Sequence, residues 1–231
     1  MRVSLNEIQV MCRKAFEGMG FAAGDCEDAA ELVGWLHLQG LDGVGTLGKA
    51  LDFLDREAQP PYTLCHEDSA LLVIDAQGQS VLRCAATVVE LAQGKALHSG
   101  QAVLRIRHCH NRLLLLGYLS RAAELGLDVQ VRWADARQQH QATFVAGVSR
   151  PVVHCDDQPG PCHVVEQSIT VVFSKPVGQV QPVDFAHDRL NQGFIVSEHT
   201  WQRLKHFANQ ILVESTDASR QHGAGGGNDA D

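Results

Sequence analysis

The sequence predicts a mixed α/β (α+β) fold, in which an N-terminal helical subdomain packs on a mixed sheet covered by helices. Two patterns lead to this prediction. Apolar residues recur at helical spacing in three segments before residue 61, and short apolar runs then alternate with helical segments up to residue 133. Such alternation favours a sheet with helices on its surface. A chain of 231 residues is long enough to bury this core.

The first part of the chain predicts three short amphipathic helices. Ser4 and Glu7 form a capping box at the start of the first helix. Asp25 is expected to cap the second helix through its carboxylate. The third helix is predicted over residues 46–58, because two prolines follow it and cannot continue a helix. Glycines are expected to end the first two helices: Gly20 and Gly40.

The middle of the chain predicts the sheet and its covering helices. Each expected strand is a short apolar run bounded by turn residues, and each expected helix has an apolar face. The strands are expected over residues 70–74, 102–107, 127–133, 152–154 and 168–173. The helices between them are expected over residues 80–98 and 113–125.

The last part predicts a linker, a closing helix and a tail. Residues 175–182 are rich in proline, glycine and glutamine, and Ser197 is expected to cap the helix that follows. Residues 219–231 are polar and glycine-rich, as expected for a flexible tail. We therefore divide the chain into a helical subdomain (1–61), a sheet-and-helix core (62–175), a linker with the closing helix (176–214) and the tail (215–231).

Composition limits the function classes. The net charge is −8 and the isoelectric point is near 5.8, which argues against bulk attraction to nucleic acid or to an anionic membrane. No apolar run is long enough to span a bilayer. Seven cysteines, an odd and scattered set, favour a reducing cytoplasm over a secreted disulfide framework. We expect a cytoplasmic protein that binds neither nucleic acid nor membrane.

Three stretches of this chain resemble the type 2 malate/L-lactate dehydrogenases, which are oxidoreductases without a Rossmann fold. They are the helical start through residues 40–42, residues 73–126 with their order of strand, glycine turn, helix and strand, and residues 147–151. The chain is shorter than those enzymes, so the resemblance implies their scaffold with a large internal deletion. This shortened form resembles the uncharacterised bacterial family DUF3726.

The resemblance also shows a missing catalytic pair. Those dehydrogenases carry a Ser-His pair after the second helix, and its histidine moves a proton while hydride passes to the nicotinamide. This sequence has Gly43 and Val44 at that place. A retained acid/base would be His110, with His108 as the second choice, in the cluster that follows the strand ending at Arg107.

The same resemblance implies a set of binding residues for a cofactor or ligand. Lys49 stands near the position of the family's substrate-binding arginine, but an ammonium group cannot grip a carboxylate in the two-point manner of a guanidinium. The other members follow the strands of the core. They are His108, Asn111 and Arg150.

Two functions follow from these observations. The first is a non-catalytic or strongly diverged protein that binds a small carboxylic acid, or that serves as a subunit of a homo-oligomer or of a complex with another protein. The alternative is an NAD(P)-dependent oxidoreductase of 2-hydroxy or 2-oxo acids with a replaced acid/base. A zinc site at 154–155 and 162–163 is the less favoured interpretation of those His-Cys pairs, and a hairpin with reduced thiols is preferred. We therefore predict no metal site.

Overall fold

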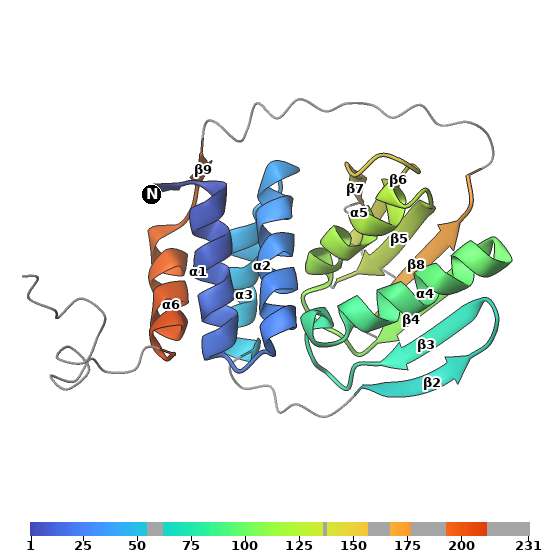
Figure 1. The fold of residues 1–231 in the computed structure, drawn as a ribbon, viewed down its shortest axis with the longest axis horizontal. Coiled ribbons are helices and arrows are strands. Elements are labelled where there is room, and N and C mark those ends of the chain that lie inside the picture. The colour runs from blue at the N-terminus through green and yellow to red at the C-terminus, as the bar shows by residue number, and fades with distance from the viewer. Residues whose placement is uncertain (55–61, 136–137, 157–166, 177–192, 212–231) are drawn as a thin grey trace, which may run out of the picture.

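The structure is a computed structural model and describes residues 1–54, 62–135, 138–156, 167–176 and 193–211. Within these ranges, a group of helices lies beside a seven-stranded mixed sheet (Figure 1). The predicted mixed α/β fold is confirmed. In the described ranges, no helix has the length and apolar character needed to cross a membrane. The expected tail at 215–231 and most of the expected linker lie outside the described residues.

The helical part combines both ends of the described chain. Its helices are α1 (Leu5–Gly18), α2 (Ala23–Leu38), α3 (Gly43–Leu54) and α6 (Glu198–Asn209). Helix α6 packs against α1 and α3, although more than 140 residues separate it from either of them along the chain. The short strands β1 (Arg2–Val3) and β9 (Phe194–Ile195) pair antiparallel, and the Met1 ammonium donates to the Val196 carbonyl oxygen at 2.9 Å. The segment before α6 is thereby attached to the N-terminus.

Local capping signals set two of the helix starts as predicted. The Ser4 hydroxyl accepts from the Glu7 N–H and the Glu7 carboxylate accepts from the Ser4 N–H, so the capping box is confirmed. The Ser197 hydroxyl caps α6 in the predicted way. The prediction for Asp25 was wrong. Helix α2 begins at Ala23, and Asp25 lies in its first turn, where a carboxylate still interacts favourably with the positive end of the helix dipole.

The seven strands are arranged in an order that differs from their order along the chain. They are β2 (Thr63–Glu67), β3 (Leu71–Asp75), β4 (Gln101–Arg107), β5 (Asp128–Ala134), β6 (Gln139–Phe144), β7 (Val152–Asp156) and β8 (Ile169–Ser174). The order across the sheet is β2-β3-β4-β8-β5-β6-β7. Only β3 and β4 are parallel neighbours, and all other pairs in this sheet are antiparallel.

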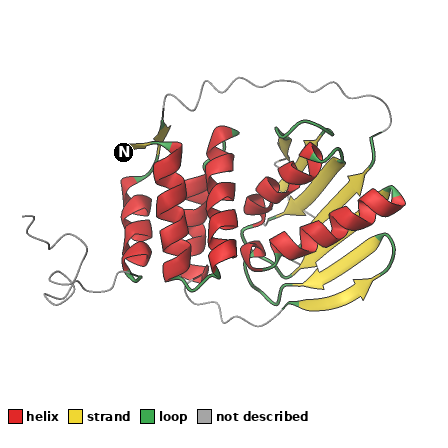
Figure 2. Cartoon of the chain, in the orientation of Figure 1, coloured by secondary structure: helices red, strands yellow, loops and turns green. Residues whose placement is uncertain are grey.

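Successive side chains of each strand point to opposite faces of the sheet, and only one of these faces is covered by helices. Helices α4 (Ala85–Ser99) and α5 (Leu116–Glu124) pack on one face (Figure 2). The central strands turn every second side chain toward these helices, where it is fully buried. The buried members in the middle of the sheet are Leu104, Ile106, Val131, Val171 and Phe173. This layer and the interior of the helical part form one continuous core.

The helical part is joined to the helix layer where α2 meets α5. Gly117 of α5 allows this approach, because a Cβ there would overlap the side chain of Leu32. At the edge of the contact, the Arg121 guanidinium donates to Asp28 at 3.0 Å and to Glu31 at 2.8 Å. Partial burial opposes the charge on Arg121, but the bond to Asp28 and the two nearby carboxylates raise its pKa overall.

The helices of the core are shorter than predicted, and two strands were missed. The segment expected as one helix over 80–98 consists of the 3₁₀ turn η1 (Val81–Arg83) and α4, and the one expected over 113–125 consists of η2 (Arg112–Leu115) and α5. Strands β2 and β6 were not predicted. All five residues of β2 are exposed, so this strand has no buried face to reveal it in the sequence.

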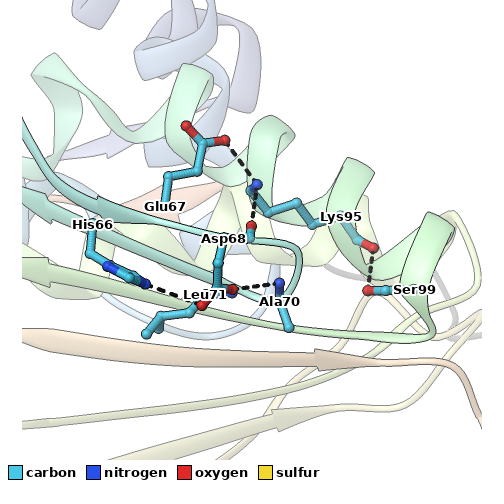
Figure 3. Close-up of polar contacts among 7 residues, drawn as sticks. All are labelled: His66, Glu67, Asp68, Ala70, Leu71, Lys95 and Ser99. Carbon is cyan, nitrogen blue, oxygen red and sulfur yellow. Dashed lines mark hydrogen bonds and ion pairs between the residues drawn. The ribbon is translucent and has the colours of Figure 1, made fainter.

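The edge hairpin of β2 and β3 is attached to α4 by Lys95 (Figure 3). The Lys95 ammonium donates to the Asp68 carbonyl oxygen at 2.6 Å and pairs with Glu67 at 2.8 Å. The Asp68 carboxylate accepts from the N–H groups of Ala70 and Leu71, and it meets the His66 ring at 3.1 Å. These bonds, with the Ala70 bond the largest cause, lower the pKa of Asp68 to about 2.

Candidate functional site

The candidate site lies at the carboxyl ends of the parallel strands β3 and β4. Parallel strands joined by a crossover helix end at the same edge of a sheet, and ligands of open α/β sheets bind there. The chain leaves β3 through residues 75–80 and leaves β4 through residues 107–112. We call these segments the paired loops. They are bonded to one another by the donors Ala76 N–H to Arg107 O, Gly78 N–H to His108 O and His110 N–H to Gln79 O.

The paired loops hold unusual backbone conformations. Three non-glycine residues in the described ranges have positive φ, and all three lie here: Gln77 (54°), His108 (46°) and Asn111 (57°). Positive φ is uncommon for any residue other than glycine; asparagine and histidine are enriched there, whereas glutamine is not. Left-handed residues kept in place by their surroundings cluster at functional sites. This backbone observation marks the paired loops independently of any resemblance.

An acid and an imidazole meet where the two paired loops lie side by side. His108 Nδ1 lies 2.8 Å from the Asp75 carboxylate, with about half of the His108 side chain and a quarter of the Asp75 side chain exposed. Partial burial raises the pKa of Asp75, but the bonds from the Gln77 N–H and the His108 ring lower it overall. Asp75 is therefore ionised at neutral pH and orients the ring of His108.

His110 is the more buried imidazole of the loop after β4. Its backbone carbonyl oxygen accepts from the N–H of Val81, the residue directly after the other loop, at 3.0 Å. Burial, and then the positive charge of Arg112, lower the pKa of His110. The ring is therefore neutral at pH 7, with one nitrogen that can accept a proton or hydrogen bond and one that can donate.

Two adjacent side chains present buried polar atoms to this region. In the part of the chain that the structure describes, Asn111 Oδ1 and Arg112 Nη1 are both buried without a hydrogen-bond partner. A buried polar atom without a partner costs about 1–3 kcal/mol, so native proteins retain few of them. The Asn111 amide oxygen accepts hydrogen bonds, and the positively charged Arg112 guanidinium donates them. A hydroxyl group is the kind of partner that the first atom lacks, and a carboxylate is the kind that the second lacks.

The structure brings some of the predicted site residues together and separates others. His108, His110 and Asn111 share one loop, whereas Lys49 is exposed on α3. Arg150 lies between β6 and β7, beside the Thr143–Val152 pair. β5 runs in the same direction as β4, and β6 runs in the opposite direction. Arg150 follows β6, so it lies at the end of the sheet where β4 begins, opposite to the paired loops.

The segment that resembles the dehydrogenases' Ser-His region serves here as a helix start. The Asp42 carboxylate accepts from the Gly45 N–H at 2.8 Å, and His37 Nε2 accepts from the Val44 N–H at 3.0 Å. Burial lowers the pKa of His37, and the charge of Asp42 opposes this effect only in part. Both side chains thus cap α3.

Sequence reasoning missed several residues of the site. Asp75 was seen only as the end of a strand, and Gln77 and Arg112 were not singled out. The available signal was the succession of strand, helix and strand over residues 71–107, which predicts a parallel pair with both carboxyl ends at one edge. The pairing of these ends required the strand order.

Part of the chain matches a known protein family. Residues 3–89 match the family model DUF3726, a protein of unknown function. The matched region contains the first three helices, the hairpin of β2 and β3, and the first of the paired loops. The resemblance to this family, predicted from the sequence, is confirmed. No curated protein matches the sequence.

Solved dehydrogenases share the fold at low sequence identity. A dehydrogenase from Sinorhizobium meliloti superposes with a TM-score of 0.67 at 14% identity, over 90% of this chain and 99% of that chain. The sulfolactate dehydrogenase from Methanocaldococcus jannaschii gives 0.63 at 13%, over 91% and 97%. The malate dehydrogenase from Pyrococcus horikoshii gives 0.54 at 17%, over 68% and 50%. The chain therefore shares its fold with these solved dehydrogenases.

Proposed function

We propose that this protein binds a small 2-hydroxy or 2-oxo carboxylic acid at the paired loops and does not turn it over. The observation that carries the proposal is the pair of buried, unpartnered atoms, Asn111 Oδ1 and Arg112 Nη1. The guanidinium would bind the carboxylate, and the amide oxygen would accept from a hydroxyl group. The dehydrogenase-type scaffold of the solved neighbours supports the ligand class.

The absence of turnover is proposed from the segment at residues 40–47. A proton-transfer residue must lie within hydrogen-bond reach of the reacting group and must be available to exchange its proton. Here Asp42 and His37 are committed to capping α3, and Gly43 and Val44 occupy the place of the dehydrogenases' Ser-His pair. A binding or sensing role therefore accounts for the retained scaffold better than catalysis does.

Calorimetric titration with L-lactate, L-malate and their 2-oxo counterparts tests this function. We expect binding of at least one acid, and Arg112→Gln should weaken it about tenfold or more, because a hydrogen bond to a charged group is lost. The matched control is Arg132→Gln, which removes the same charge from an exposed position on β5. No heat with any of the acids at millimolar concentration, or equal losses in both variants, would contradict the proposal.

The alternative is an NAD(P)-dependent oxidoreductase in which the neutral His110 replaces the missing acid/base. The cofactor fits the described residues poorly. The loop after β3 contains a single glycine, Gly78. Arg83 of the 3₁₀ turn η1 that follows lies over the Phe21 ring at 3.5 Å, where it is engaged in a cation–π contact. We therefore derive no hydride step. Oxidation of NADH or NADPH with a 2-oxo acid, lost in His110→Gln, would favour this alternative.

A reducing compartment is part of the proposal. All six cysteines in the described ranges are free thiols, four of them buried. Burial raises the pKa of Cys12, Cys84 and Cys109 to about 12, so these thiols stay protonated and inert. Such a set of unpaired thiols is typical of a protein that works in the cytoplasm.

A further inference from the structure

A second cluster of reactive side chains lies away from the paired loops, where β5, β6 and β7 meet at the edge of the sheet (Figure 1). His140 of β6 and Cys155 of β7 are cross-strand partners. His140 Nδ1 lies 3.4 Å from the Cys155 sulfur, and His140 Nε2 lies 3.0 Å from the Asp135 carboxylate. β6 is three strand positions from β4, which places this cluster roughly 14 Å from that strand.

The histidine ring of this cluster is held in place from several directions. The Trp133 ring stacks on it with centroids 5.1 Å apart and an angle of 12° between the planes. The other oxygen of the Asp135 carboxylate accepts from the Gln138 N–H at 2.9 Å, which orients the acid. The His140 side chain is 15% exposed, so it is shielded while Cys155 remains accessible. The cluster is thus an ordered row of thiol, imidazole and carboxylate.

This row is arranged for proton transfer and not for a metal. A bond from Nε2–H to Asp135 leaves Nδ1 as the acceptor, which faces the thiol. The thiol and the carboxylate lie at opposite nitrogens of one ring, so they cannot share an ion. A nucleophile, a base and an orienting acid in contact are the arrangement that activates a thiol.

The other cysteines lack this arrangement. Cys65, the second exposed cysteine in the described ranges, contacts only the Thr63 carbonyl oxygen, at 3.8 Å. The remaining four described cysteines are buried: Cys12, Cys26, Cys84 and Cys109. Burial is also the main cause that raises the pKa of Cys26. Reactivity toward electrophiles should therefore concentrate at Cys155.

The geometry points to Cys155 as a nucleophilic thiol that forms a mixed disulfide with low-molecular-weight disulfides, with His140 as its base and Asp135 as the positioning residue. His140 Nδ1 takes the thiol proton. The Cys155 thiolate attacks one sulfur of the disulfide, so that a new sulfur–sulfur bond forms and the old one breaks. The leaving thiolate receives the proton from the imidazolium. The Cys155 sulfur is oxidised and the leaving sulfur is reduced.

The test is the rate of modification of each cysteine by oxidised glutathione, followed by peptide mass spectrometry. It uses the full chain with Cys162→Ser, because Cys155 and Cys162 share one tryptic peptide. At a pH of about 6, Cys155 should react about tenfold or more faster than Cys65, and His140→Gln should remove most of this difference. Asp135→Asn should slow the reaction as well. His154→Gln is the matched control, since strand alternation directs the neighbouring imidazole to the other face.

A pH profile separates a base from a merely structural residue. If His140 acts as the base, the rate of the His140→Gln variant should approach that of the parent as the pH rises to about 9, because thiols then ionise without a base. Thermal unfolding followed by circular dichroism verifies that each variant is folded. Equal reactivity of Cys155 and Cys65 in the parent protein overturns the proposal. A rate that is unchanged in folded His140→Gln overturns it too.

Discussion

At the scale of single residues, glycines show where backbones must approach one another. Gly43 begins α3 directly against α2, and a Cβ there would overlap the Val33 carbonyl oxygen. Gly94, in the middle of α4, has no atom within 4 Å of the position of a Cβ. The first glycine is required by packing, and the second only adds freedom to the unfolded chain.

These two glycines therefore respond in opposite directions to the same substitution. Gly94→Ala should raise the free energy of unfolding by about 0.5–1 kcal/mol, because alanine favours the helix. Gly43→Ala should lower it by about 1–3 kcal/mol, because the rigid backbone of α2 must move. Urea denaturation measures both. A stabilising Gly43→Ala would contradict the close contact of α2 and α3.

At the scale of elements, the hairpin of β2 and β3 depends on Asp68. β2 buries no side chain, so besides its pairing with β3 its position depends on the bonds that the Asp68 carboxylate and Lys95 make in the turn (Figure 3). The hydrogen bonds from Ala70, Leu71 and His66 stabilise the ionised form of the Asp68 carboxylate. Its pKa lies near 2, below its ordinary value of 3.8.

This lowered pKa predicts an acid-sensitive hairpin. A carboxylate whose pKa is lowered in the folded state stabilises that state at pH values above the ordinary pKa of the group. This contribution is lost as the pH falls through the pKa of the folded state, here between about pH 4 and about pH 2. Asp68→Ala should therefore lower the urea midpoint near neutral pH, and the difference from the parent should shrink near pH 2. Leu64→Ala, an exposed substitution on the same strand, is the control. A difference that does not depend on pH would contradict this account.

At the scale of the whole molecule, the sheet has one face away from its helices. Val103 of β4 lies between Leu71 of β3 and Val172 of β8 in the register. All three side chains belong to the face opposite α4 and α5 and are only partly buried. Apolar side chains in such a position favour association with another subunit.

We accordingly expect a homo-oligomer, with a complex with another protein as the alternative. Sedimentation velocity at micromolar concentration should show a dimer or larger species, and Val103→Glu should dissociate it because a charge would enter the contact. Leu125→Glu replaces an apolar residue that is 61% exposed elsewhere and should have no effect. A monomer at this concentration would contradict a homo-oligomer and leave a protein partner to be sought.

The sequence by itself determined the elements whose signals are local. Ser4 with Glu7 and Ser197 cap helices through bonds to residues three positions away, and the apolar run before Asp75 forms a strand wherever that strand is placed. The mixed α/β fold class and the cluster after β4 followed from such signals. Asp25 failed as a cap because the chain turned into α2 two residues earlier.

Only the tertiary structure decided which of these elements meet. β8 enters the sheet between β4 and β5, and this insertion determines the direction of β5 and β6 and thereby the edge at which Arg150 lies. The contact of His140 with Cys155 likewise depends on the register of two strands. Many different strand orders would have similar local interaction energies, so local signals do not determine which strands pair. The pairing is resolved by the burial of the shared core, which no single segment of the sequence contains.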